Sequence, residues 1–319
     1  MFRKIVFPSL LLMAVSVTAA AQNPPAPILP GGQVIPLYPP GSHFLKLDRA
    51  GEAEHDNMSQ TVPGRINSIV NIHNPSIEFH PVDRGINTGT VVILIPGGGH
   101  RTLNVGSEGA DFVPFFYNYG VNTVILRNRL RSDGYNPQVD AVNDALQSIR
   151  LVRSHAREWN LDPNKIGVMG FSAGAELATA AAVFFEKFDR DNQSAGDALA
   201  GVSSRPDFVG VIYPGPSPFA PDRAAPPIPK SVPPSFVVCA GSGDRVHALW
   251  AIQYFSAMLA QSVPNIEMHI YGRGRHPGDP LPDGSHMSGG LTDRGGMPFG
   301  TWQYRFIDWF RDLGFLARR

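Results

Sequence analysis

The chain has 319 residues, with 27 Lys and Arg balanced by 27 Asp and Glu, so its formal net charge at neutral pH is zero. This balance, without a cluster of basic residues, excludes the electrostatic footprint of a nucleic-acid-binding protein. Charged residues make up only 17%, while Gly and Pro number 33 and 30, which argues against a disordered chain or a coiled coil and predicts a loop-rich globular protein.

The first 21 residues have the pattern of a signal peptide. Arg3 and Lys4 precede an apolar run that ends near Val17, and the small residues Ala19–Ala21 follow it. The run is too short to span a bilayer but suits an export signal with its cleavage site. We therefore expect a mature chain that begins near Gln22 and is exported, to the periplasm or the medium. No later stretch approaches the length of a membrane helix.

Residues 22–64 are interpreted as a lead-in segment, because 23–42 are rich in proline and favour an extended backbone. Residues 65–319 are interpreted as a single domain. Within it, eight apolar runs are typical of strands. They are Arg65–Ile72, Ile77–Pro81, Thr90–Ile95, Val121–Leu126, Lys165–Met169, Phe208–Tyr213, Ser235–Ala240 and Ile266–Tyr271.

The connections between these runs indicate how the strands pair. The first two runs are joined by the short turn Asn74-Pro75, which predicts an antiparallel pair, whereas helix-like segments separate the later runs and predict parallel pairing. Apolar residues recur at helical spacing over 142–159, 302–313 and 112–119. The fold class is therefore α/β, an eight-stranded and mostly parallel sheet with helices on both faces. Cys239, the single cysteine, lies in a strand and is expected to be a structural, unreactive thiol.

The segment Gly170-Phe171-Ser172-Ala173-Gly174 has the form G-x-S-x-G. It directly follows an apolar strand and directly precedes the helix-forming run 175–182. This strand–turn–helix context is what a nucleophile elbow needs, since it exposes the serine at the apex of a sharp turn. The free N–H groups of the helix N-terminus face the charge that develops there. Ser172 is the predicted nucleophile.

A second glycine-rich turn, Pro96–His100, follows the strand that ends at Ile95. Glycines let backbone N–H groups approach a substrate carbonyl without obstruction by side chains. We predict an oxyanion hole formed by the N–H of Gly98 or Gly99 together with that of Ala173.

A serine nucleophile needs a base, and the base needs an orienting acid. Asp244 follows the strand two after the elbow strand, and His276 follows the last strand, so the chain order is Ser–Asp–His. Both lie where catalytic groups of open α/β sheets gather, at the carboxyl ends of strands. His286, ten residues beyond His276, is the competing candidate for the base. His100, His247 and His286 are otherwise expected to line the substrate pocket.

With these residues in view, the chain resembles the α/β-hydrolase superfamily and, within it, bacterial exported acetylxylan-esterase-like carbohydrate esterases. The resemblance covers most of residues 34–315 and is most specific over Arg150–Ala178; further matches are Ile35–Pro39, Asn71–Pro75, Val92–His100, Arg127–Leu130 and the closing Gly300–Phe310. It implies Ser172 as nucleophile, Asp244 as acid, His276 as base and the glycine turn as oxyanion hole. The chain departs from the family pattern after His276, where Pro277-Gly278-Asp279 and a Gly-rich insertion follow, and at His100, where aromatic residues are common.

The leading hypothesis is a serine ester hydrolase that removes acetyl or other short acyl groups from sugar or plant polysaccharide esters, with no metal or organic cofactor required. A general carboxylesterase, a feruloyl-type esterase or a serine peptidase on the same fold is the enzymatic alternative. A binding protein that kept the fold and lost the chemistry is the third hypothesis, since fold alone does not determine function. Nothing in the sequence indicates an oligomeric state.

Overall fold

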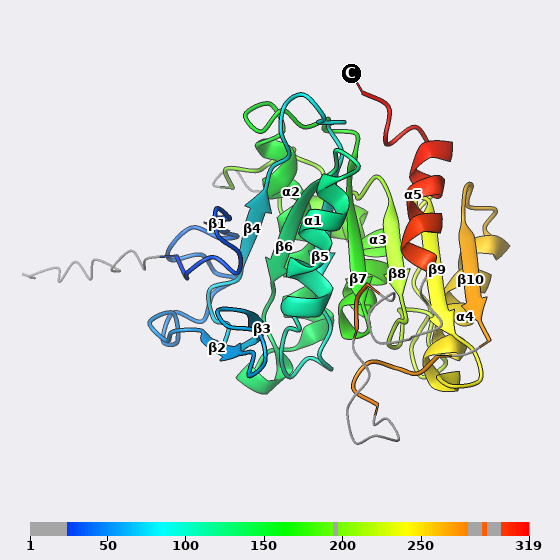
Figure 1. Cartoon of the computed structure of the whole chain (residues 1–319), viewed down its shortest axis with the longest axis horizontal. Helices are drawn as coiled ribbons and strands as arrows, with labels where there is room; N and C mark the ends of the chain where they lie inside the picture. Colours follow the sequence, from blue (N-terminus) through cyan, green and yellow to red (C-terminus); the bar gives the residue numbers. More distant parts are fainter. Residues whose placement is uncertain (1–23, 194–196, 273, 280–288, 292–300, 319) are drawn as a thin grey trace, which may run out of the picture.

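The computed structural model describes residues 24–193, 197–272, 274–279, 289–291 and 301–318. In this part of the chain, eight strands form one sheet in the order β1-β4-β6-β5-β7-β8-β9-β10, which runs across the molecule in Figure 1. From β6 to β10 in this order, which includes β5, all neighbouring strands are parallel. Strand β4 is antiparallel to both of its neighbours, β1 and β6. The predicted α/β class with a mostly parallel sheet is confirmed. The strands are β1 (Gln33–Pro36), β4 (Ser76–His80), β5 (Val91–Ile95), β6 (Asn122–Arg127), β7 (Ile166–Phe171), β8 (Val209–Ile212), β9 (Ser235–Ala240) and β10 (Glu267–Tyr271).

Helices cover both faces of the sheet, as predicted. Side chains of α2 (Val142–Ser154), α3 (Ala173–Asp191) and α4 (Arg245–Ala260) share one buried cluster with the sheet, and those of α1 (Phe112–Tyr117) and α5 (Trp302–Asp312) share a second cluster on the other face (Figure 1). Short helical turns occur at η1 (Gly106–Ala110), η2 (Arg131–Asp133) and η3 (Pro137–Ala141). The expected stripe over 142–159 continues past the helix, because α2 already ends at Ser154.

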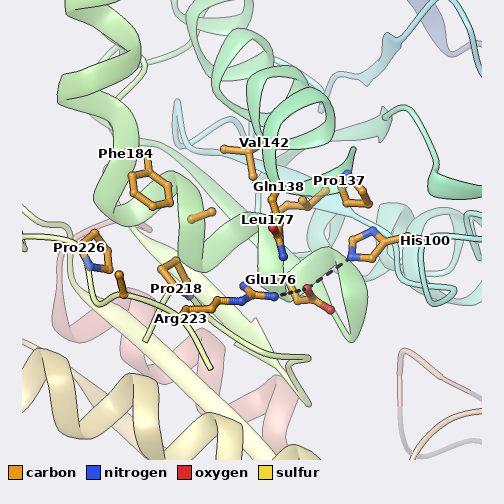
Figure 2. A pocket seen from close by; sticks show the side chains of 12 residues that line it. His100, Pro137, Gln138, Val142, Glu176, Leu177, Phe184, Pro218, Arg223 and Pro226 are labelled. Atoms are coloured by element: carbon orange, nitrogen blue, oxygen red, sulfur yellow. Dashed lines mark ion pairs between the residues drawn. The ribbon is translucent and has the colours of Figure 1, made fainter. Parts of the chain in front are cut away.

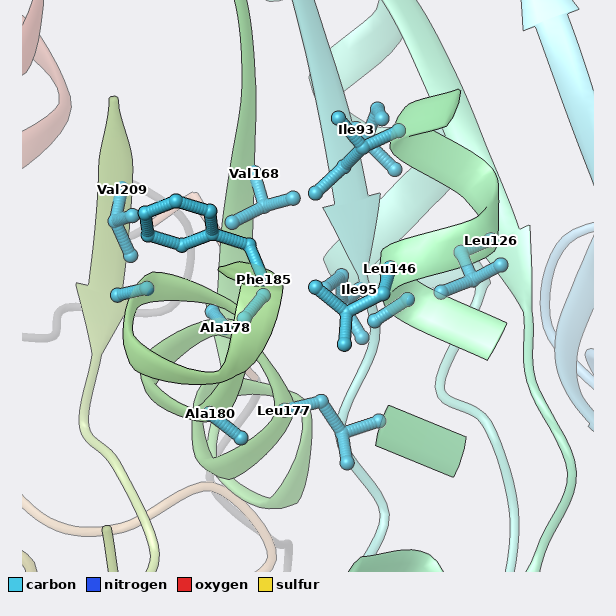
Figure 3. Packing of buried hydrophobic residues seen from close by; sticks show 14 of the residues in the cluster. Ile93, Ile95, Leu126, Leu146, Val168, Leu177, Ala178, Ala180, Phe185 and Val209 are labelled. Carbon is cyan, nitrogen blue, oxygen red and sulfur yellow. The ribbon is translucent and has the colours of Figure 1, made fainter. Parts of the chain in front are cut away.

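The two cores are separated by the central strands, which are apolar on both sides. In β5, Ile93 and Ile95 pack toward α2 and α3, as Figure 3 shows, whereas Val92 and Leu94 pack toward α1 and α5. Alternation of side chains along a strand makes this continuous apolar run necessary for a sheet covered on both faces. Cys239 in β9 is fully buried, and burial raises the pKa of its thiol to about 12, which keeps it protonated and unreactive.

The predicted pairing of the first two strands is wrong. The run from Arg65 contains β3 (Ile66–Val70), which pairs antiparallel with β2 (His55–Met58) in a separate two-stranded sheet. Directly after β3, Asn71 has a φ of 61°, in the left-handed region, and its side chain donates to the carbonyl of Ala53. This bend turns the chain before the Asn74-Pro75 turn, so β3 does not form a hairpin with β4.

The eighth strand of the large sheet is instead β1, from within the segment interpreted as a lead-in. β1 pairs with β4 in the register Gln33 to Phe79 and Pro36 to Ser76. Pro36 has no N–H to donate, which suits the end of an edge strand. The expected signal peptide, residues 1–21, lies outside the described residues. No helix in the part of the chain that the structure describes is long and apolar enough to cross a membrane.

Candidate active site

Ser172 occupies the strained turn between β7 and α3. Its backbone has φ 50° and ψ −116°, a conformation that non-glycine residues adopt only when the surrounding structure enforces it. A Cβ on Gly170 would overlap the carbonyl of Gly174, and a Cβ on Gly174 would overlap the carbonyl oxygen of Ile95. The two glycines of the motif therefore let α3 start directly against the ends of β7 and β5, as the elbow prediction requires.

The side chains of Ser172, His276 and Asp244 form one hydrogen-bonded chain. Ser172 Oγ lies 2.9 Å from His276 Nε2, and His276 Nδ1 lies 3.0 Å from Asp244 Oδ2. A Cβ on Gly243 would overlap the carbonyl oxygen of Gly274, so this glycine allows the loops after β9 and β10 to touch. The three predicted residues thus meet although 104 positions separate the serine from the histidine.

His247 occupies a place that the sequence analysis did not predict. Its Nδ1 lies 2.6 Å from Asp244 Oδ1, and its ring stacks on that of His276 with centroids 3.5 Å apart. One carboxylate therefore accepts from two stacked imidazoles. Burial raises the pKa of Asp244, but the hydrogen bonds from His247 and His276 outweigh it and hold the pKa at about 2. The Asp244 carboxyl is consequently ionised at neutral pH.

Asp244, His247 and His276 are also a group whose possible metal-ligand atoms lie within 4.8 Å of one another. Both histidine Nδ1 atoms are already hydrogen-bonded to Asp244. A metal ion bound through these atoms would replace those hydrogen bonds and remove the orientation of His276 toward Ser172.

The glycine turn after β5 lies beside the nucleophile. A Cβ on Gly97 would stand 2.9 Å from Ser172 Cβ. Gly98 and Gly99 have φ values of 127° and 63°, which side chains disfavour. Among the described residues, no backbone carbonyl accepts from the N–H of Gly98, Gly99 or Ala173. These three predicted donors therefore keep hydrogen-bonding capacity for a ligand.

The glycine turn after β5 is also held by a buried carboxyl group, that of Glu108, which the sequence analysis did not predict. Glu108 Oε2 accepts from the N–H of Gly97 at 2.7 Å, and Glu108 Oε1 accepts from the hydroxyl of Tyr213 at 2.9 Å. The Tyr213 oxygen accepts in turn from the N–H of Gly290 at 2.8 Å, and the Tyr213 ring meets that of His276 edge-on. The network ties together the turn after β5, the segment after β8 and the segment that follows His276. A lone acidic residue in a helical turn leaves no sequence signal for such a role.

Glu108 also predicts a pH-dependent stability. Burial raises the pKa of Glu108 to about 7 from an ordinary 4.5, despite hydrogen bonds from Gly97, Tyr213 and Asn104. A carboxyl with a raised folded-state pKa holds its proton longer in the folded state, so the folded state loses stability as the pH rises from about 4.5 to about 7. Relative to Glu108→Gln, the wild type should lose roughly 3 kcal/mol across this range.

Urea unfolding of both proteins at pH 5 and pH 8 measures this difference. Glu186→Gln, which changes an exposed carboxyl that contacts only the hydroxyl of Ser231 among the described residues, is the matched control and should give the same difference at both pH values. A wild-type to Glu108→Gln difference that does not change with pH would show that Glu108 titrates normally.

The remaining predicted residues fall in different places. His100 follows the glycine turn and lines a pocket of about 340 Å³ beside α3 (Figure 2). His247 is not among the residues that line this pocket, because it lies against Asp244 and His276. His286 lies outside the described residues.

Parts of the chain are similar to known proteins. Residues 80–210 match the family model BD-FAE. The chain is 28% identical over 127 residues to an acetylxylan esterase of Xylanibacter ruminicola, covering 40% of this chain and 23% of the relative. It is 32% identical over 124 residues to endo-1,4-beta-xylanase B of Butyrivibrio fibrisolvens, covering 39% of this chain and 19% of the relative. The chain thus spans less than a quarter of the length of either relative.

Solved structures with the same architecture include an acetyl ester-xyloside bifunctional hydrolase from Caldicellulosiruptor lactoaceticus, with a TM-score of 0.64 and 23% identity over 91% of this chain and 99% of that one. The carboxylesterase Cest-2923 of Lactobacillus plantarum has a TM-score of 0.60 and 18% identity over 84% of this chain and 100% of its own. The chain therefore has the α/β-hydrolase fold, and its residues 80–210 are similar to the BD-FAE family.

Proposed function

We propose that the chain is a carboxylic ester hydrolase that removes acetyl or other short acyl groups from sugar or plant polysaccharide esters. The observation that carries the proposal is the continuous hydrogen-bonded chain from Ser172 Oγ through His276 to Asp244 at a strained elbow. The relationship to acetylxylan esterase supports the choice of ester and substrate class.

The geometry supports an acyl-enzyme mechanism. Ser172 Oγ attacks the acyl carbon while His276 Nε2 takes the hydroxyl proton, and the carbonyl electrons move to the oxygen. Donors at Gly98 or Gly99 and at Ala173 stabilise this oxyanion. The C–O bond to the alcohol then breaks, and His276 returns the proton to the leaving oxygen. Water repeats the sequence on the acyl-enzyme, which releases the carboxylic acid and restores Ser172.

Asp244 contributes by its charge and its geometry. Its carboxylate accepts from His276 Nδ1, which fixes the tautomer that leaves Nε2 free to accept the serine proton. Because the pKa of Asp244 is about 2, the carboxylate stays ionised and stabilises the imidazolium that forms in the transition state.

Acyl release from a panel of substrates tests the proposal. Acetylated xylan and acetylated monosaccharides should be hydrolysed with a higher kcat/KM than feruloyl esters, and peptide amides should not be cleaved. Faster release of ferulate would favour the feruloyl-type alternative, cleavage of amides would favour a peptidase, and no turnover of any ester would favour a binding protein.

We also propose that the chain is exported, on the basis of Arg3, Lys4, the short apolar run and Ala19–Ala21. Expression with its own N-terminus in a bacterial host should deliver the protein outside the cytoplasm, and N-terminal sequencing should find a start near Gln22. Replacing Arg3 and Lys4 with glutamate should retain it inside the cell. A folded cytoplasmic product that starts at Met1 would contradict export.

A further inference from the structure

The pocket next to the elbow has a polar end and an apolar end. It lies between the start of α3, the η3 turn and the loop after β8 (Figure 2). Its polar end contains His100, Glu176 and Arg223, and its volume of about 340 Å³ is at the small end of the range for small-molecule sites. The other lining residues are largely apolar: Pro137, Gln138, Val142, Leu177, Ala180, Phe184, Pro218, Ala224 and Pro226.

The polar groups at this end are close together, but their hydrogen-bonding capacity is not satisfied by one another. His100 is 95% buried, and its Nε2 has no hydrogen-bond partner among the described residues. Glu176 Oε2 lies 3.5 Å from that nitrogen and 3.8 Å from an Arg223 guanidinium nitrogen. Figure 2 shows the carboxylate of Glu176 between the other two groups. A buried polar atom without a partner is costly unless a ligand or water supplies one.

This end of the pocket lies beside the reacting centre. Glu176 stands in the first turn of α3, where its N–H lies 3.4 Å from the carbonyl oxygen of Ser172. His100 follows Gly99, one of the predicted oxyanion donors, and has a φ of 58°. The pocket is therefore lined by residues adjacent to the glycine turn and to the elbow, although Ser172 and His276 themselves do not line it.

We propose that this pocket binds the saccharide alcohol of the ester through its hydroxyl groups, an inference that rests on the proposed function and assigns the residues that select its substrate. A sugar hydroxyl donates to the Glu176 carboxylate and accepts from the Arg223 guanidinium, and His100 Nε2 bonds a further hydroxyl. Because the Arg223 guanidinium and the Glu176 carboxylate lie side by side, the pocket favours a neutral ligand with several hydroxyl groups over a strongly charged ligand.

The apolar end suits the same ligand. The aromatic ring of Phe184 and the pyrrolidine rings of Pro218 and Pro226 offer apolar surfaces to the C–H faces of a sugar ring. The Arg223 guanidinium donates through one nitrogen to the carbonyls of Pro216 and Ser217. An acyl chain would leave His100 Nε2 without a partner and would bury the charges of Glu176 and Arg223 under hydrocarbon, which is unfavourable. The pocket therefore favours the alcohol side of the ester over the acyl side.

Two substitutions keep side-chain size approximately: Arg223→Met removes the guanidinium, and Glu176→Gln removes the negative charge of the carboxylate. Arg223→Met and Glu176→Gln should each lower the ratio of kcat/KM on acetylated xylo-oligosaccharide to kcat/KM on 4-nitrophenyl acetate by about tenfold, mainly through KM. The small aryl ester has no sugar to place in the pocket, so it reports the catalytic residues alone. Arg311→Met and Glu158→Gln, which alter exposed residues elsewhere, should leave the ratio unchanged.

A binding measurement on an inactive variant tests saccharide binding in the pocket independently of ester hydrolysis. Xylotriose without acetyl groups should bind to Ser172→Ala in isothermal titration, and adding Arg223→Met should weaken binding at least tenfold. A ratio that stays within twofold of wild type, or a change in the preference for butyrate over acetate esters instead, would overturn the saccharide pocket. Absence of turnover on every ester would overturn the proposed function, while xylotriose binding would still decide the pocket.

Discussion

Ser172→Ala is expected to lower kcat on 4-nitrophenyl acetate by roughly 10⁵- to 10⁶-fold, the loss found when the nucleophile of a coupled triad is removed. Ser172 Oγ is the atom that His276 Nε2 contacts at 2.9 Å, so the variant keeps the base and the oxyanion donors but has no atom that can form the acyl-enzyme. Residual hydrolysis would come from binding and the oxyanion hole.

The fold of Ser172→Ala should be intact. The backbone strain at position 172 is set by the close packing of Gly170 and Gly174, and alanine occupies the same conformation with one atom fewer. Steady-state kinetics together with the midpoint of thermal unfolding test both points. A variant that unfolds at the wild-type temperature and keeps more than a few per cent of its activity would exclude Ser172 as the nucleophile.

His276→Ala should lower kcat by several orders of magnitude, because the general base and the group that reprotonates the leaving alcohol are lost together. His286→Ala should instead change KM or acyl preference by about tenfold or less, a free-energy difference near 1.4 kcal/mol. His55→Ala, at an exposed position of β2, serves as the matched control and should behave as wild type.

Exogenous imidazole sharpens this comparison. It should restore part of the activity of His276→Ala, since the vacated space lies between Ser172 and the Asp244 carboxylate, and should not affect His286→Ala. The reverse pattern, with the large loss and the rescue in His286→Ala, would assign the role of base to His286 instead of His276.

The features that the sequence predicts correctly are those set by residues close together in the chain. The elbow could be read from the sequence because a strand, two glycines and a helix former stand next to one another around Ser172. Asp244 and His276 could be placed because each follows a strand within a few residues, and parallel strands end at the same edge of a sheet.

The parts that escaped prediction depend on long-range contacts. Whether β1 or β3 joins the large sheet is decided by pairing with β4 and by the bend at Asn71, and an isolated strand pattern carries no information on its partner. The sequence predicts His247 in the pocket because it shows only that this residue follows Asp244. The orientation of its ring toward Asp244 depends on the first turn of α4, in which His247 lies. The contacts of Glu108 with Gly97 and Tyr213, over 105 positions for the tyrosine, exist only in the folded chain.

Mass spectrometry of the protein treated with a fluorophosphonate tests the central claim most directly, because this reagent reacts only with a serine activated by its base. A single phosphonyl adduct is expected on the peptide that contains Ser172, absent in Ser172→Ala and formed far more slowly in His276→Ala. An adduct on a different residue, or full esterase activity with Ser172 unlabelled, would contradict a mechanism built on Ser172, His276 and Asp244.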